Sequence, residues 1–444
     1  MTPIDSVELI PHDRLVDEIH RPLLARQLQR VLATSGFYDE KLRALGLDAA
    51  DLACGGSLER LPFTEKAELL AEQAQHPPFG RLMRDVPTSS VRRIHVTSGS
   101  TGRQLYVVLS EADVAATREA GRRAFRCAGL TPEDTVIHCL NYCLWAGGVT
   151  DHISLEATGA TVIPFGVGNT RRLIETIKTV RPTAISCTPS YMSRLEMVVR
   201  NDFGMVPIDL GLRKGLFGGE GGLQRKAVRD QIERTWGIEA IDANYGMADV
   251  LSIFGAECPA RNGLHFHGQG IVHLELIDPM TGAFLPIRDG QAGEMVLTNL
   301  TREAQPVLRY RTRDVVSVVG TSPCTCGRHS LRFRVEGRSD DMFTVRGVNV
   351  YPDALRNLVA EHPDWFGGEF EIVLASPPPI ERPLVVVEAA EHGTVPPAGL
   401  EEALAQACRE RMGFTPAVEV VPWGTLPRTE GKTRRVRRTY QEGT

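Results

Sequence analysis

Strand-like and helix-like segments alternate between about residue 111 and about residue 240. The short apolar stretches TVIHCL, TVIPF, TAISCT and KGLFGGE are separated by segments with helical spacing of apolar residues, such as EADVAATREAGRRAFRCAG and TRRLIETIKTV. Strands that alternate with helices form a parallel sheet whose faces the helices cover. We therefore predict an α/β fold. Ligands in such folds bind beyond the carboxyl ends of the strands, so the loops after RRIHV, KGLFG and AIDANY are candidate site walls.

Three further regions surround this alternating segment. Residues 14–45 have the spacing of an entry pair of helices, and RRIHV and YVVLS, joined by TSGSTGRQ, predict a β-hairpin. Residues 270–320 are strand-rich and predict a small antiparallel subdomain. After a break at EGRSDDM, about the last 100 residues suit an α+β domain. We predict a large N-terminal domain over residues 1–337, with mostly parallel sheets, and a smaller C-terminal α+β domain over residues 338–444.

Composition excludes several classes of protein. The chain of 444 residues carries a net charge of −5, which argues against a nucleic-acid partner because phosphate backbones require basic surfaces. It has no apolar run of about 18 residues, so we expect no membrane span, and the charged N-terminal segment has no apolar core of a signal peptide. The nine cysteines, an odd number, mostly stand singly in apolar segments and predict reduced thiols in a cytoplasmic protein.

A loop rich in hydroxyls and glycines follows the segment RRIHV. It consists of Thr97, Ser98, Gly99, Ser100, Thr101 and Gly102, followed by Arg103. Glycines let backbone amides approach an anion closely, and hydroxyls add donors, so the loop suits phosphate binding. It differs from the Walker pattern, which the chain lacks. By itself, the loop is equally compatible with an ordinary hairpin connection.

Five further motifs favour phosphate binding. They are Gly218-Gly219-Glu220, Tyr245-Gly246-Met247-Ala248-Asp249, Tyr310-Arg311-Thr312-Arg313-Asp314, Gly337-Arg338-Ser339-Asp340-Asp341 and Pro427-Arg428-Thr429-Glu430-Gly431-Lys432. Together with the loop at 97–103, these segments resemble the adenylate-forming superfamily of acyl-CoA synthetases, adenylation domains and luciferases. The phrases LRYRTRD, GRSDDMFTVRGVNVYP and TPSYM are similar to the phenylacetate–CoA ligase branch. The resemblance covers about residues 90–440.

The resemblance implies an ATP-dependent ligase that activates a carboxylic acid as its acyl-adenylate and passes the acyl group to coenzyme A. It implies an aromatic or aryl-acetic substrate, Mg²⁺ as cofactor and a C-terminal domain that moves as a lid. One alternative acceptor is the phosphopantetheine thiol of an acyl carrier protein. A nucleotide-binding relative without ligase activity is a second alternative, and homodimer formation is left open.

Residue roles follow from the same resemblance. The loop Thr97–Gly102 is expected to hold the ATP phosphates and Tyr245 to stack on adenine, unless it is an ordinary core tyrosine. Asp314 should bind the ribose hydroxyls, since an ionised carboxylate accepts from both. The remaining residues expected at the nucleotide are Gly219, Glu220, Asn244, Gly246, Met247 and Arg338. For Arg311 we expect a solvated charge cluster instead.

Two residues, Lys432 and Asp249, are expected to act in catalysis, and a third is expected to be a hinge. Lys432 should meet the α-phosphate and the substrate carboxylate, and Asp340 should be the hinge between two arrangements of the small domain. Asp249 stands where the family usually has a Glu that helps to hold Mg²⁺, and Ala248 replaces a hydroxyl residue there. The arginines after Lys432 we expect at the surface (Arg434, Arg435, Arg437 and Arg438).

The acyl pocket and a metal site complete the expectations. The resemblance implies a pocket lined by Tyr142, Trp145, Gly147, Phe217 and Gly218, in which aromatic rings enclose an aryl group; plain core positions are the alternative. The spacing of Cys258, His265, Cys324 and Cys326 suits a structural Zn²⁺ with four protein ligands. His267 and His329 are alternative ligands, and four reduced side chains without metal are the other interpretation.

Overall fold

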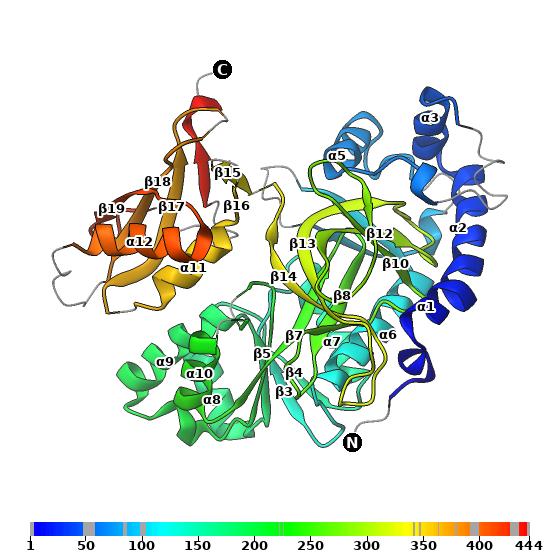
Figure 1. Ribbon diagram of the computed structural model, residues 1–444. Coiled ribbons are helices and arrows are strands. Elements are labelled where there is room, and N and C mark those ends of the chain that lie inside the picture. Colours follow the sequence, from blue (N-terminus) through cyan, green and yellow to red (C-terminus); the bar gives the residue numbers. More distant parts are fainter. Residues whose placement is uncertain are drawn as a thin grey trace. The chain divides into compact units, whose positions relative to one another are not determined.

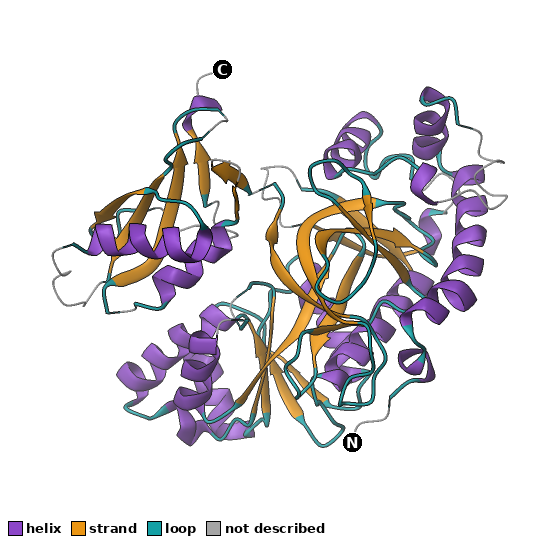
Figure 2. Cartoon of the chain, in the orientation of Figure 1, coloured by secondary structure: helices purple, strands orange, loops and turns teal. Residues whose placement is uncertain are grey.

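The computed structural model describes residues 4–47, 58–82, 87–97, 104–221, 223–224, 226–340, 342–345, 348–362, 364–377, 380–390, 399–426 and 435–441. The chain divides into two compact units, which Figures 1 and 2 show. The first runs to Thr312 and includes Ser317–Arg334, and the second comprises Arg313–Val316 and the chain from Val335 on.

One sheet of 12 strands forms the centre of the first unit (Figure 1). Its parallel part contains β3 (Thr135–His138), β4 (Thr161–Pro164), β5 (Ala184–Cys187), β6 (Lys214–Gly218) and β7 (Glu239–Met247). The other part contains β8 (Leu251–Glu257), β9 (Leu264–Phe266), β10 (Val272–Ile277), β11 (Phe284–Leu285), β12 (Ala292–Asn299), β13 (Tyr310–Gly320) and β14 (Arg332–Arg338). The direction changes at β7, which pairs with β6 in parallel and with β8 antiparallel. The predicted α/β class is confirmed.

Helices cover both faces of the parallel part. On one face, α6 (Glu111–Cys127) and α7 (Ala146–Glu156) bury residues against the sheet, and on the other α8 (Thr170–Val180), α9 (Pro189–Phe203) and α10 (Lys226–Trp236) do so. Consecutive strand residues point to opposite faces, so Leu216 joins the first core and Phe217 the second. In α8 the apolar residues Leu173, Ile174 and Ile177 are all fully buried, as a helical stripe on a covered sheet must be.

Two expected elements precede this sheet. The helical pattern of residues 14–45 corresponds to α1 (His12–Leu15), η2 (Val16–His20), α2 (Arg21–Thr34) and α3 (Gly36–Ala44). The predicted hairpin is confirmed, since β1 (Val91–Val96) pairs antiparallel with β2 (Tyr106–Ser110). Ser110 then begins α6 with a capping box, in which its hydroxyl accepts from the backbone of Asp113 and the Asp113 carboxylate accepts in return.

The second unit is an α+β domain, as predicted. Its four-stranded sheet has the order β19 (Ala417–Val421), β18 (Leu384–Ala389), β17 (Phe366–Leu374) and β20 (Val436–Arg438), with α11 (Pro352–Ala360), α12 (Leu400–Met412) and a hairpin of β15 (Phe343–Val345) and β16 (Val348–Val350). Of the four arginines expected at the surface, Arg437 is exposed and Arg434 lies outside the described residues, whereas Arg435 is largely buried. Arg435 pairs with Glu369 at 2.5 Å and lies over the ring of Phe370, because β20 adds to the edge of β17.

Within the described residues, no helix is both long and apolar enough to cross a membrane.

A buried ion pair ties the N-terminal segment to the sheet. Glu8, which is 1% exposed, accepts from Arg328 Nε at 2.8 Å and lies 3.2 Å from His267 Nδ1. Burial acts to raise the pKa of Glu8, but the hydrogen bonds and charges of His267 and Arg328 outweigh it and lower this pKa from 4.5 to about 2. Because the folded pKa is depressed, the stabilising contribution is complete above pH 4.5 and is lost as the pH falls towards 2.

We predict that Glu8→Gln destabilises the protein by about 2–4 kcal/mol at neutral pH, since it leaves the Arg328 cation buried without its charge partner. The difference from the wild type should shrink below pH 4.5. Urea unfolding at several pH values measures both effects. The matched control is Glu18→Gln, which breaks the exposed pair with Arg14 and should leave the midpoint unchanged. An equal midpoint for Glu8→Gln and the wild type would contradict the prediction.

Candidate active site

The carboxyl ends of β6 and β7 lie side by side and define the centre of the candidate site. Gly218 ends β6 opposite Asn244, and a Cβ on Gly218 would stand 2.5 Å from both Cβ and the carbonyl oxygen of Asn244. Only glycine fits this close approach. Gly219 follows with a φ of +80°, which also favours glycine. Glu220 Oε1 accepts from the backbone of Ser190 at 2.7 Å, at the N-terminal turn of α9.

Thr97 closes the base of the expected phosphate loop. It is 4% exposed, its backbone donates to Leu105 at 3.0 Å, and its hydroxyl accepts from the backbone of Leu105 at 3.2 Å. The loop residues Ser98, Gly99, Ser100, Thr101 and Gly102 lie outside the described residues, and so does Lys432. The strand before the loop contacts the expected acyl segment, because Val96 donates to the carbonyl of Leu144 at 3.0 Å. The start of the phosphate loop and the segment 141–145 are therefore neighbours.

The acyl segment combines aromatic and polar contacts. The hydroxyl of Tyr142 lies 3.0 Å from His152 Nδ1, and its ring packs edge-on against His138 at 5.5 Å between centroids. Trp145 is half-buried and bridges to β1, and α7 begins at the next residue. A Cβ on Gly148 would stand 2.2 Å from the carbonyl of Asn141, whereas one on Gly147 would meet only Leu140, at 3.7 Å.

Phe217 differs from the expectation that it lines this pocket. Its side chain is fully buried in the core that α8, α9 and α10 form on their face of the sheet. Gly218, the next residue along β6, points to the opposite face, where α7 lies. Consecutive strand residues face opposite sides of the sheet, and the sequence FGG alone does not show which residue faces which side.

Tyr245, Gly246 and Met247 continue β7 beyond Asn244. The ring of Tyr245 packs edge-on against Phe254 and Phe333, with centroid distances of 5.2 and 5.4 Å, which leaves it half-buried. A Cβ on Gly246 would stand 2.1 Å from the carbonyl of Ser252, so this position must be glycine. Aromatic neighbours thus orient the ring that we expect to stack on a base.

Asp249 lies just after β7 and is paired with two side chains that the sequence did not indicate. Its carboxylate accepts from the Tyr310 hydroxyl at 2.5 Å and lies 3.3 Å from Lys66 Nζ. Lys66 is the first residue of α5 (Lys66–Gln75). No local pattern could reveal this pair, because 183 residues separate Lys66 from Asp249. The Lys66 ammonium thus lies beside Asp249, the expected metal ligand.

Asp314, Arg338 and Asp340 form one network in the second unit. Arg338 donates to Asp314 at 3.0 Å, and it makes two hydrogen bonds of 2.9 Å to the carboxylate of Asp340. A guanidinium is planar and suits such a forked contact. The expected ribose ligand and the expected hinge residue therefore share one arginine.

Arg311 does not belong to a solvated cluster, which corrects our expectation. It makes a two-pronged contact with Glu294 at 2.9 and 2.7 Å and lies over the ring of Phe63. The side chain of Glu294 is completely buried, and its charge requires a partner. The hydrogen bond and charge of Glu294 raise the pKa of Arg311, against the effect of burial.

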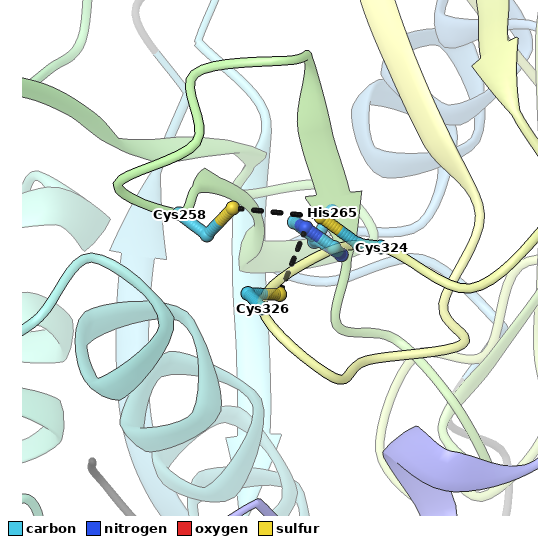
Figure 3. A group of neighbouring side chains, drawn as sticks. All are labelled: Cys258, His265, Cys324 and Cys326. Atoms are coloured by element: carbon cyan, nitrogen blue, oxygen red, sulfur yellow. Dashed lines mark hydrogen bonds between the residues drawn. The ribbon is translucent and has the colours of Figure 1, made fainter.

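Three cysteines and one histidine converge from separate segments of the first unit (Figure 3). Cys258 follows β8, His265 lies in β9, and Cys324 and Cys326 lie in the loop between β13 and β14. Their ligand atoms all lie within 4.8 Å of one another, with 3.8 Å between the sulfurs of Cys258 and Cys324 and 3.6 Å between Cys326 Sγ and His265 Nε2. Tetrahedral Zn²⁺ with sulfurs at about 2.3 Å requires ligand atoms roughly 3.7 Å apart, so the four residues fit it.

The surroundings of this cluster hold the ligands in place. Ser330 Oγ contacts His265 Nδ1 at 2.8 Å, which leaves Nε2 facing the sulfurs. Contacts with Cys258 and His265 lower the pKa of Cys326 to about 2, although burial acts to raise it. His267 instead faces Glu8, and neither His267 nor His329 belongs to the group of four.

The chain matches two family models. The first, described as AMP-binding enzyme, covers residues 23–300, and the second, AMP-binding enzyme C-terminal domain, covers residues 347–439. A phenylacetate–coenzyme A ligase of Thermus thermophilus is 32% identical over 97% of this chain and 98% of the relative. The phenylacetate–coenzyme A ligase of Escherichia coli is 31% identical over 98% of this chain and 97% of the relative.

Solved structures show the same similarity. A crystal structure of 2-hydroxyisobutyryl-CoA ligase in the postadenylation state, in complex with 2-HIB-AMP, matches with a TM-score of 0.83 and 29% identity, over 99% of this chain and 94% of that one. The same ligase in complex with 2-HIB-AMP and CoA in the thioesterification state matches with a TM-score of 0.69 and 30% identity, over 97% and 91% of the two chains.

Proposed function

The chain belongs to the AMP-binding enzyme family, and we infer that it is an AMP-forming acid–CoA ligase that acts on an aryl-acetic acid. The observation that carries this inference is the near full-length similarity to phenylacetate–coenzyme A ligases, at 31% and 32% identity. The order of motifs along the chain agrees with this inference: the Thr97 loop comes first, followed by the ends of β6 and β7, then Asp249 and Asp314.

The reaction has two steps. The substrate carboxylate attacks the α-phosphorus of ATP, pyrophosphate leaves, and an acyl-adenylate forms. The sulfur of CoA then attacks the acyl carbon and AMP leaves, while the thiol proton passes to solvent or a base. The first step develops charge on phosphate oxygens, so positioned cations and backbone amides accelerate it.

We assign roles to residues on this basis. Thr97 and the loop after it would hold the phosphates, Tyr245 would stack on adenine, and Asp314 with Arg338 would bind the ribose. Lys432 would supply the cation for the first step, and Asp340 would be the hinge for the rearrangement before the second. The pairing of Asp340 with Arg338 supports this, because rotation at a hinge can exchange such a contact.

We predict that the purified protein exchanges pyrophosphate into ATP when phenylacetate or a ring-substituted phenylacetate is present, and that it forms a thioester with free CoA. Lys432→Ala should lower the exchange rate by about 100-fold or more, since it removes a charge used in the transition state. Lys226→Ala, at an exposed position of α10, is the matched control and should keep the wild-type rate. Absence of exchange with every aryl-acetic acid would refute the ligase assignment; thioester formation only on a carrier protein would refute CoA as acceptor.

Asp249 would bind Mg²⁺ together with phosphate oxygens of ATP. Mg²⁺ prefers oxygen ligands and in nucleotide sites often takes only one or two carboxylates, so the single carboxylate of Asp249 fits. The metal would neutralise phosphate charge. Lys66, at 3.3 Å from this carboxylate, would hold it in position and add a second positive charge beside the phosphates.

We predict that Asp249→Asn raises the Mg²⁺ concentration for half-maximal exchange by about tenfold or more, because the neutral amide is a weaker ligand. Asp249→Glu should keep the wild-type Mg²⁺ dependence. Titration of exchange activity with Mg²⁺ measures both, and Asp230→Asn, on the exposed face of α10, serves as control. An unchanged Mg²⁺ requirement in Asp249→Asn would remove this residue from metal binding.

Cys258, His265, Cys324 and Cys326 would hold one structural Zn²⁺. Four protein ligands leave no open position, so the metal would stabilise the fold and take no part in the reaction. Asn262 Nδ2 lies 3.6 Å from Cys324 Sγ, and Arg328 Nη1 lies 3.8 Å from Cys326 Sγ. Both donors suit sulfurs that carry negative charge.

We predict about one Zn²⁺ per chain by elemental analysis of protein purified without chelators. Cys324→Ser should lose most of this zinc and lower the melting temperature, since the metal links two loops of the sheet. Cys143→Ser, an exposed cysteine outside the cluster, should retain the metal. A wild-type protein free of zinc after growth in zinc-supplemented medium would contradict the site.

A further inference from the structure

A β-bulge in β7 turns Asn244 towards α7. The register pairs Phe217 with Asp242 and Gly218 with Asn244, so Ala243 is an extra residue on β7. In a regular strand Ala243 and Asn244 would face opposite sides of the sheet. Here Ala243 packs in the core under α6 and α7, and Asn244 contacts a residue of α7 on the same face. Bulges near sites commonly redirect a side chain in this way.

The partner of Asn244 on α7 is a buried carboxyl group. Asp151 has no exposed surface, and its Oδ2 accepts a hydrogen bond from Asn244 Nδ2. Its other oxygen, Oδ1, has no hydrogen-bond partner in the described structure. Burial raises the pKa of Asp151 well above its ordinary value, which favours the neutral form of the carboxyl group. A buried polar atom without a hydrogen-bond partner lowers the stability of the folded protein, so its presence here calls for an explanation.

Asn244 itself is half-buried and lies three residues before the end of β7. Asp151 accepts one hydrogen of the Asn244 amide, and within the described part of the chain the Asn244 side chain makes no other hydrogen bond. The second N–H and the carbonyl oxygen therefore stay available to a ligand. Gly218 leaves the space that the Asn244 side chain occupies, and Gly147 and Gly148 lie one turn before Asp151 on the same helix.

We propose that Asn244, oriented by Asp151, is a specificity-determining residue of the acyl pocket, and that the preferred acid carries a hydroxyl on its aryl ring. This proposal rests on the ligase function inferred above, and it moves Asn244 from the nucleotide to the acid. A hydroxyl both donates and accepts, so it can pair with the carbonyl oxygen and the free N–H of Asn244 at once. An analogue that lacks the hydroxyl leaves those groups unpaired, and sites built for a substrate hydroxyl discriminate strongly for this reason.

The test compares phenylacetate with its 2-, 3- and 4-hydroxy derivatives in acid-dependent pyrophosphate exchange. We expect at least one hydroxylated acid to exceed phenylacetate in kcat/KM by about tenfold or more. Asn244→Leu, similar in size but apolar, should reduce that preference to about twofold or less while the KM for ATP stays unchanged. Asp151→Asn keeps an oxygen acceptor for Asn244 and should retain the preference, whereas Asp151→Leu should lose it. Glu156→Gln, on the exposed face of α7, is the matched control.

Each other outcome overturns the proposal. Equal kcat/KM for phenylacetate and all three hydroxylated acids would show that the pocket reads no hydroxyl. A preference that survives Asn244→Leu would place its origin elsewhere. A higher KM for ATP in Asn244→Leu, with every acid affected equally, would return Asn244 to the nucleotide. Exchange with phenylacetate in any of these cases leaves the ligase function intact, and only a failure of all acids refutes that function. If Asp151→Leu does not fold, Asn244→Leu alone decides.

Discussion

The pairing of β7 with a parallel strand on one side and an antiparallel strand on the other is the constraint on which the candidate site depends. Because β6 and β7 run in the same direction, Gly218 at the carboxyl end of β6 lies beside Asn244 of β7. The antiparallel return through β8 then sets Phe254 against Tyr245. Close packing at this edge leaves no room for a Cβ at Gly218 or Gly246. The glycines of these motifs are therefore required by the backbone before any ligand arrives.

The polar groups at this edge share a second property, which is that other side chains orient them from behind. Asp249 is held by Lys66 and Tyr310, and Asn244 is held by Asp151. Groups fixed in this way need little rearrangement when charge develops on a substrate, and this preorganisation is the main source of electrostatic catalysis. This arrangement costs stability, because it buries charges and leaves atoms such as Oδ1 of Asp151 without a hydrogen-bond partner. Only a bound ligand or the rest of the fold can offset that cost.

A chain of polar contacts also connects the cysteine cluster with the N-terminal segment. Arg328 reaches Cys326 with one nitrogen and Glu8 with another, and Glu8 in turn faces His267. Glu8 comes from the beginning of the chain, whereas His267 follows β9, and Cys326 and Arg328 lie in the loop before β14. The stability of the N-terminal segment is thus coupled to the loop that carries two of the four candidate metal ligands. Loss of the contact of Arg328 with either Cys326 or Glu8 would leave a charge without its partner in a low-dielectric interior.

The sequence by itself determined the class of fold, because the periods of apolar residues distinguish strands from helices and the alternation requires a parallel sheet. It also determined which motifs occur and their order, and the spacing of the four cysteine and histidine residues. It could not determine that Phe217 is a core residue whereas Gly218 lies against Asn244, since strand phase depends on neighbouring strands. Nor could it find Lys66 beside Asp249 or Asp151 beside Asn244, because such pairs form between residues distant in the chain. Only the tertiary structure brings them within hydrogen-bond distance, where burial and charge then decide what they do.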